Sequence, residues 1–188
     1  MSDSQKKEEI ADKISKKFHE YFLQYGMKKT IVDDVVRSLG MSKKTIYKYF
    51  KGGKEEALYF FYRKIADAHV IQLENKISSI SSVKEKLRYV LQQIYEISRP
   101  HVEANVAAED DYAVEAEIVG SAFKEAYQDI LKNTILEGIQ SKVFNSVDVE
   151  LTINLIRGMI LESLRIVHQN HSRQVEDNVI DAIMKILQ

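Results

Sequence analysis

The stretch TIVDDVVRSLGMSKKTIYKYF, from Thr30 to Phe50, decides the fold of the N-terminal part of this chain. Its first half repeats apolar residues at helical spacing, namely Val32, Val35, Val36 and Leu39. Gly40 can then adopt the backbone angles that reverse the chain, and Ser42 can cap a second helix. Ile46 and Phe50 lie four residues apart, so both can pack that second helix against the first. The spacing predicts a helix-turn-helix, two helices joined by a short turn.

The outward face of the second helix carries cations and hydroxyl groups. Its residues are Lys43, Lys44, Thr45, Tyr47 and Lys48. Cations pair with phosphates, and hydroxyls can hydrogen-bond to phosphates or base edges, so this face has the chemistry of a DNA contact. A lysine-rich helix face is also common as plain solvated surface, and helix-Gly-helix turns occur in many bundles. DNA binding therefore needs support from the rest of the chain.

The composition favours long helices. The 188 residues are 45% hydrophobic and 29% charged, with one proline and seven glycines. This profile suits uninterrupted helices better than a turn-rich β protein, and the length suffices for one ordinary domain or two small ones. We expect an all-α protein with a substantial core.

Charge divides the chain into two parts. Residues 1–64 hold 15 Lys+Arg against 9 Asp+Glu, whereas residues 65–188 hold 12 against 19. A basic N-terminal module fits a polyanion, and an acidic remainder would be repelled by the same phosphates. The asymmetry supports a DNA-contacting module followed by a module with another partner.

Several classes of protein are disfavoured. The chain has no cysteine, so it offers neither disulfides nor thiolate chemistry. No Gly-rich phosphate loop, nucleophile elbow or paired-carboxylate arrangement stands out, so we expect no enzyme and no cofactor. The polar N-terminus and the lack of a long apolar run predict a cytoplasmic protein without a membrane span. His168 and His171 would form a metal site only on a continuous helix, and we expect none.

Helical periodicity extends along the whole chain. The first helix carries Ile10, Ile14, Phe18, Tyr21, Phe22 and Tyr25 and ends near Gly26. After the Gly52-Gly53 break we expect helices at residues 54–76, from Ser82 to Arg99-Pro100, at 101–110 in a short irregular form, and at 112–140, 148–169 and 173–187. ISSISS, residues 77–82, is the expected loop. Pro100 is expected to end the helix that begins near Ser82, because proline disfavours helix geometry in the residue before it.

The last two helices are the most apolar. Apolar residues in 148–169 cover more of the circumference than one core-facing stripe needs, and 173–187 repeats the pattern. A helix apolar on two faces should be buried on two faces. The hypothesis is that both helices pack against their copies in a second chain as a four-helix interface, and the alternative is a wholly intramolecular core.

The segment from Phe18 to Leu58 resembles the N-terminal DNA-binding domain of the TetR family of transcriptional regulators. The resemblance rests on Phe18, Gly26, Thr30, the VDDVV stretch at 32–36, Gly40-Met41-Ser42, Thr45-Ile46-Tyr47, Tyr49-Phe50, Lys54 and Leu58. It implies an all-helical homodimer of about nine helices. Residues 1–52 would form a three-helix helix-turn-helix DNA-binding domain, and residues 53–188 an effector-binding and dimerisation domain.

The resemblance also implies the residues that contact DNA. They are Thr30, Ser42, Lys43, Lys44, Thr45, Tyr47, Lys48, Tyr49 and Lys54. The recognition helix would run from Ser42 to Tyr49, and Thr30 would cap the preceding helix and touch a phosphate. Two departures from the family pattern stand out. Gly52-Gly53 inserts a residue before Lys54, and Ile31 stands where a second threonine is common.

The implied function is that of a repressor that binds a palindromic operator as a dimer and is released by a small-molecule effector. The linker helix, residues 54–76, would transmit the change. Candidate effector-binding residues are Tyr89, Tyr95, Tyr112, Phe123, Tyr127, Arg157, Met159, Glu162 and Arg165. Two alternatives remain: a DNA-bound regulator whose C-terminal domain binds a protein partner, and a small-molecule carrier without DNA binding.

Overall fold

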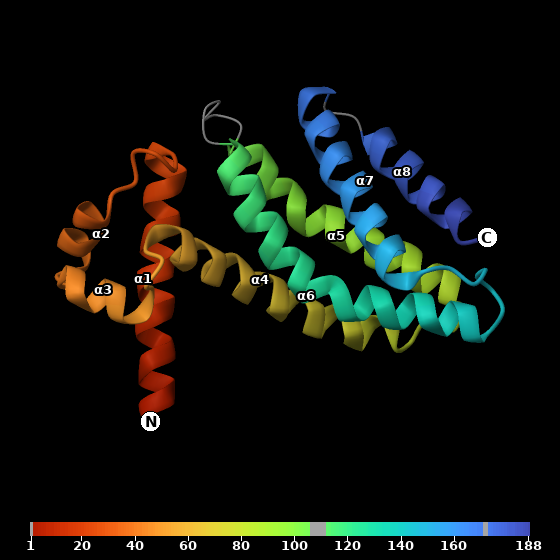
Figure 1. The fold of residues 1–188 in the computed structure, drawn as a ribbon, viewed down its shortest axis with the longest axis horizontal. Coiled ribbons are helices and arrows are strands. Elements are labelled where there is room, and N and C mark those ends of the chain that lie inside the picture. Colours follow the sequence, from red (N-terminus) through yellow and green to blue (C-terminus); the bar gives the residue numbers. More distant parts are fainter. Residues whose placement is uncertain (1, 106–111, 171–172) are drawn as a thin grey trace. The chain divides into compact units, whose positions relative to one another are not determined.

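The computed structural model describes residues 2–105, 112–170 and 173–188, and all its regular structure is helical (Figure 1). The helices are α1 (Asp3–Tyr25), α2 (Val32–Leu39), α3 (Lys43–Tyr49), α4 (Lys54–Ile77), α5 (Val83–Asn105), α6 (Tyr112–Gln140), α7 (Val149–Asn170) and α8 (Arg173–Ile186). The all-α prediction is confirmed. Of the helices described, none is long and apolar enough to span a membrane.

The chain divides into two compact units. The first comprises Met1–Ala66 with Asn105–Phe123, and the second comprises Asp67–Ala104 with Lys124–Gln188. Helices α4 and α6 each contribute residues to both units. The boundary expected at residue 52 separates a DNA-binding part from an effector-binding part. The division into compact units does not test where these two functions lie, so this boundary stays a prediction.

Helix α1 organises the described part of the first unit. Ser2 and Gln5 form a capping box at its start, which satisfies backbone N–H groups that have no partner inside the helix. Ile14 and Phe18 are fully buried on its inner face. The ring of His19 stacks on Phe61 of α4 with ring centroids 4.0 Å apart. The beginning of α4 is thus packed against α1.

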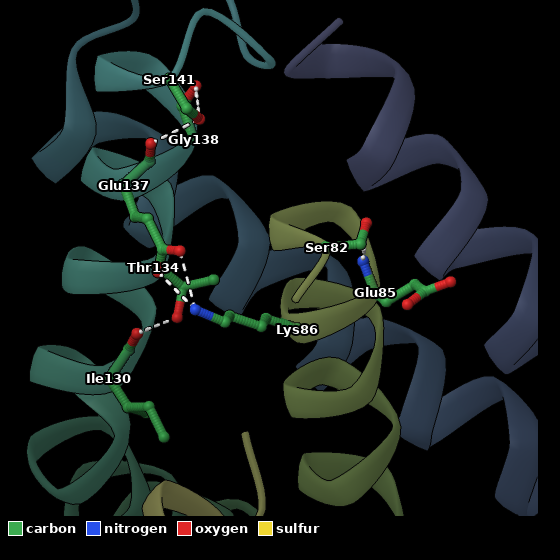
Figure 2. A network of polar contacts seen from close by, with 8 residues as sticks. All are labelled: Ser82, Glu85, Lys86, Ile130, Thr134, Glu137, Gly138 and Ser141. Carbon is green, nitrogen blue, oxygen red and sulfur yellow. Dashed lines mark hydrogen bonds and ion pairs between the residues drawn. The ribbon is translucent and has the colours of Figure 1, made fainter. Parts of the chain in front are cut away.

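Helices α5 to α8 supply the core of the second unit. Leu87, Val90 and Leu91 are fully buried on α5, and Ile183 is fully buried on α8. Figure 2 shows how α5 and α6 are also joined by charge, because the Lys86 ammonium donates to both carboxylate oxygens of Glu137 at 2.7 and 3.0 Å. Where α6 ends, a Cβ added to Gly138 would lie 2.0 Å from the ring of Phe144, so only glycine fits there.

Two predictions about α5 are corrected. The helix does not end at Arg99-Pro100 but continues to Asn105, so the N-terminal part of the separate short helix expected at residues 101–110 belongs to α5. Residues 106–111 lie outside the described part of the chain. The described residues form eight helices. Proline removes one backbone donor and biases the preceding residue, but a long helix held by packing can carry it through. Residues 78–82 of the expected loop lie between α4 and α5, whereas Ile77 is the last residue of α4, and the breaks expected at 26 and between the helices at 112–140 and 148–169 also lie between helices.

Candidate nucleic-acid interface

The turn between α2 and α3 is built on a left-handed glycine. Gly40 has φ 62° and ψ 31°, a conformation that side chains with a Cβ rarely adopt. Its N–H donates to the carbonyl of Arg37 at 3.3 Å, and the Met41 N–H donates to Val36 at 3.1 Å. These two bonds satisfy carbonyls at the end of α2 and turn the chain toward α3.

Helix α3 is capped and anchored as the pattern indicates. The Ser42 hydroxyl accepts from the backbone N–H of Thr45 at 3.1 Å. Ile46 is fully buried and Phe50 is 3% exposed, and both lie on one side of the helix. Phe50 also meets Phe60 of α4 in an edge-on ring contact. The inner face of α3 is therefore fixed, which determines the face that points outward.

The outward face keeps most of the expected chemistry. Lys44, Tyr47 and Lys48 are exposed, and Tyr47 is 45% exposed despite its size. Thr45 and Tyr49 are half-buried, and the hydroxyls of Ser42 and Thr45 share a hydrogen bond of 2.9 Å. Cations beside an exposed aromatic hydroxyl suit phosphates and groove edges.

Lys43 is engaged inside the module. Its ammonium lies 2.7 Å from the Asp33 carboxylate of α2, and this hydrogen bond raises the pKa of Lys43. No local sequence pattern marks Asp33 as the partner of Lys43. An acidic residue in the first turn of a helix is usually explained by the helix dipole, and only the folded turn shows which cation it meets.

Lys54 and Thr30 also have partners within the chain. The Lys54 ammonium donates to the carbonyls of Met27 at 2.7 Å and Thr30 at 3.2 Å. Thr30 is fully buried, and its hydroxyl donates to the Gly26 carbonyl at 2.8 Å. The residue that caps α2 is Ile31, whose side chain makes no capping hydrogen bond. The expected phosphate contacts of Thr30 and Lys54 remain predictions.

Comparison with known families accounts for this geometry. Residues 19–58 match the family described as bacterial regulatory proteins, tetR family. The chain carries a TetR-family DNA-binding domain. Its matched segment begins on α1, spans α2 and α3, and ends at Leu58 on α4, so the exposed face of α3 is the outward face of the TetR-family helix-turn-helix.

Solved structures share the fold along nearly the whole chain. RolR in complex with resorcinol is 12% identical, with a TM-score of 0.71 over 98% of this chain and 90% of RolR. FadR from Bacillus subtilis in complex with stearoyl-CoA is 21% identical, with a TM-score of 0.68 over 94% of this chain and 98% of FadR. Escherichia coli NemR in its reduced form is 14% identical, with a TM-score of 0.61 over 95% and 97%. At these identities the likeness establishes the fold. No curated protein matches the chain.

Seven of the nine candidate effector-binding residues have described side chains, and these differ in exposure. Tyr95, Phe123 and Tyr127 are buried, Tyr89 and Met159 are half-buried, and Arg157 and Glu162 are exposed. The side chains of Tyr112 and Arg165 lie outside the described residues. The buried tyrosines have polar partners, since Tyr95 shares a 2.5 Å hydrogen bond with Ser163 and Tyr127 one with His69.

Two polar partners in the second unit, His69 and Glu176, are not among the residues predicted from the sequence. His69 lies three residues after Ala66 and four before Leu73, both of them buried, so its spacing on α4 was a usable signal. Glu176 on α8 is buried and pairs with Arg99 on α5 at 2.7 Å. Those two residues are 77 positions apart, so no local pattern indicates the pair.

Proposed function

We propose that the chain is a DNA-binding transcriptional regulator that acts on a palindromic operator as a homodimer and is released by a small-molecule effector. The observation that carries this proposal is the exposed face of Lys44, Tyr47 and Lys48 on a helix whose opposite side, at Ile46, is fully buried. The match to the TetR family over the same segment supports it. The protein acts by binding rather than by catalysis, in the cytoplasm where its operator is.

Two copies of α3, related by a dimer two-fold, enter successive major grooves. The half-site centres then lie about 34 Å apart, or somewhat more, and the operator is palindromic. Each cation that neutralises a phosphate releases counterions, so affinity falls steeply with salt. With six or more phosphates per dimer, the loss is about 10³-fold or more between about 50 and 200 mM salt.

The decisive experiment selects bound duplexes from a random pool and tests the recovered site against a Lys44→Ala, Tyr47→Ala double variant. We expect a palindromic site and loss of its binding by the variant. A matched control is Lys84→Ala, Tyr25→Ala, because Lys84 is also exposed and Tyr25 is 47% exposed, close to the 45% of Tyr47. Equal binding by wild type and the α3 variant would refute the proposal.

We propose that the second copy needed for a dimer packs on α7 and α8. Leu151, Leu155 and Leu161 of α7 are 56%, 51% and 41% exposed, and Ile186 of α8 is 47% exposed. Apolar residues at this exposure on two adjacent helices indicate a covered surface. An isologous contact, in which the same patch faces itself, covers both helices at once. Sedimentation of the purified protein tests this, and a monomer at micromolar concentration would refute it.

Gly158 supports the same surface independently. It is exposed in the middle of α7, where glycine costs about 1 kcal/mol of helix stability relative to alanine. A Cβ placed there meets nothing within 4 Å in its own chain, so intramolecular packing does not require glycine. Close approach of a second chain explains it.

The effector site belongs to the helical C-terminal part. RolR is in complex with resorcinol and FadR from Bacillus subtilis with stearoyl-CoA, and both share this fold. The effector releases DNA by binding one dimer geometry more tightly than the other, and α4 transmits the change. Resorcinol and stearoyl-CoA serve as the first probes of the protein–operator complex. Release by a protein partner instead of any small molecule would favour the alternative function.

A further inference from the structure

Five lysines lie on or next to α3, and the structure separates them into two groups. Lys43 and Lys54 have acceptors within the first unit, the Asp33 carboxylate for one and two backbone carbonyls for the other. Lys44, Lys48 and Lys51 are exposed, and within the described part of the chain none of their three ammonium groups has a hydrogen bond or an ion pair. These five lysines therefore differ in whether their ammonium groups already have an acceptor within the chain.

We infer that Lys43 and Lys54 are positioning residues, which hold the recognition helix in place, and that Lys44, Lys48 and Lys51 neutralise the DNA phosphates. The inference rests on the proposed function and assigns different roles to lysines of the same DNA-contacting surface. It departs from the residue pattern of the family resemblance, which places Lys43 and Lys54 on the DNA.

The pair of Lys43 and Asp33 joins the first residue of α3 to the first turn of α2. The two charged groups lie 2.7 Å apart, with side chains 58% and 49% exposed. If Lys43 turned to a phosphate, the Asp33 carboxylate would be left unpaired near the DNA backbone, where like charges repel. Asp33 thus keeps Lys43 on α2 and also disfavours contacts with phosphates that the operator does not place correctly, which is a source of specificity.

Lys54 links the beginning of α4 to the turn before α2. It is the first residue of α4, where the helix dipole disfavours a cation, so its position needs another explanation. The ammonium donates to the carbonyls of Met27 and Thr30, two of the polar groups that the turn leaves without helical partners. An ammonium has three donors, and two of them are used here. Lys54 thereby ties the helix-turn-helix to α4.

The slope of log affinity against log salt separates the two groups, because it counts phosphates neutralised rather than overall binding strength. We expect Lys44→Met, Lys48→Met and Lys51→Met each to flatten the slope by about 1.8 per dimer, one phosphate per protomer. Lys43→Met and Lys54→Met should leave the slope unchanged. A flattening by either that equals the effect of Lys48→Met would overturn its assignment. Absence of salt-dependent binding by the wild type would instead refute the proposed function.

Asp33→Asn provides a readout that a purely structural role would not move. Freed from its partner, Lys43 reaches a phosphate and steepens the slope by about 1.8 per dimer. The double variant Asp33→Asn, Lys43→Met should return to the wild-type slope, whereas a general charge effect would leave it steep and overturn the assignment. Asp34→Asn is the matched control, since Asp34 lies next to Asp33 but pairs with Arg37 of its own helix at 3.5 Å.

For Lys54, rescue distinguishes positioning from simple loss of fold. Lys54→Met should weaken operator binding about tenfold or more at an unchanged slope and lower the melting temperature. Lys54→Arg keeps donors for both carbonyls and should recover most of the affinity and the melting temperature. If Lys54→Met instead folds with wild-type stability and affinity, the carbonyl contacts do not position the module.

Discussion

The hydroxyl of Tyr127 on α6 is hydrogen-bonded to Nδ1 of His69 on α4. Burial lowers the pKa of His69 from its ordinary value of 6.5, and a hydrogen bond to Gln93 of α5 opposes that shift. Burial also raises the pKa of Tyr127, so its hydroxyl stays protonated. A neutral histidine thus connects three helices of the second unit.

Acid should destabilise the second unit through His69. Because its pKa is lower in the folded chain, the unfolded chain binds the proton more tightly. The stability that neutral His69 contributes is fully present above pH 6.5. It is lost as the pH drops from 6.5 through the lowered pKa of the folded chain. We expect the free energy of unfolding, measured in urea from pH 7.5 to 5.5, to fall less for His69→Gln than for the wild type. Parallel pH profiles would contradict this.

Alanine at Gly158 should weaken the dimer without weakening the helix. Its methyl group favours α7 by about 1 kcal/mol in an isolated chain but crowds a close helix contact by about 1–3 kcal/mol. We expect the dimer dissociation constant from sedimentation to rise about tenfold. Gly138→Ala provides the contrast, because its Cβ would lie 2.0 Å from Phe144, and it should lower the melting temperature instead. An unchanged dimer in Gly158→Ala would remove this helix face from the interface.

Breaking the pair of Arg99 and Glu176 should cost far more than breaking a surface pair between the same helices. The side chains are only 15% and 9% exposed, so Arg99→Met leaves a nearly buried carboxylate without its cation. The expected loss in the free energy of unfolding is about 3–5 kcal/mol. Arg88 and Asp181 also join α5 to α8, but at 42% and 54% exposure, so Arg88→Met should cost less than about 1 kcal/mol. Equal losses in urea unfolding would disprove this ranking.

Two adjacent residues of α3 should separate stability from DNA binding. Ile46 is fully buried, so Ile46→Ala removes core contacts and should cost about 2–5 kcal/mol. Tyr47 is 45% exposed, so Tyr47→Ala should change the melting temperature little while it weakens operator binding. Thermal unfolding and operator titration on the same samples provide the comparison. A large stability loss in Tyr47→Ala would show that its ring serves the core instead.

Local signals were sufficient for most of the elements. The helix-turn-helix follows from Gly40, the Ser42 cap and the spacing of Ile46 and Phe50, because each acts within one or two turns of its own position. The same holds for the loop that ends at Ser82, where the Ser82 hydroxyl accepts from the N–H of Glu85. Pro100 shows the limit of such signals, since a local bias against helix was outweighed by the long helix around it.

Periodicity and charge along the sequence by themselves determined the helical class, the helix-turn-helix and the face of α3 that points outward, because these depend on neighbours a few residues apart. Only the tertiary structure decided what the polar side chains meet. Lys54 donates to a turn 24 to 27 residues away, His69 meets a tyrosine 58 residues away, and Arg99 pairs across 77 residues. Contacts at such separations arise when helices pack, and helical periodicity specifies which face is buried but not which side chain lies opposite.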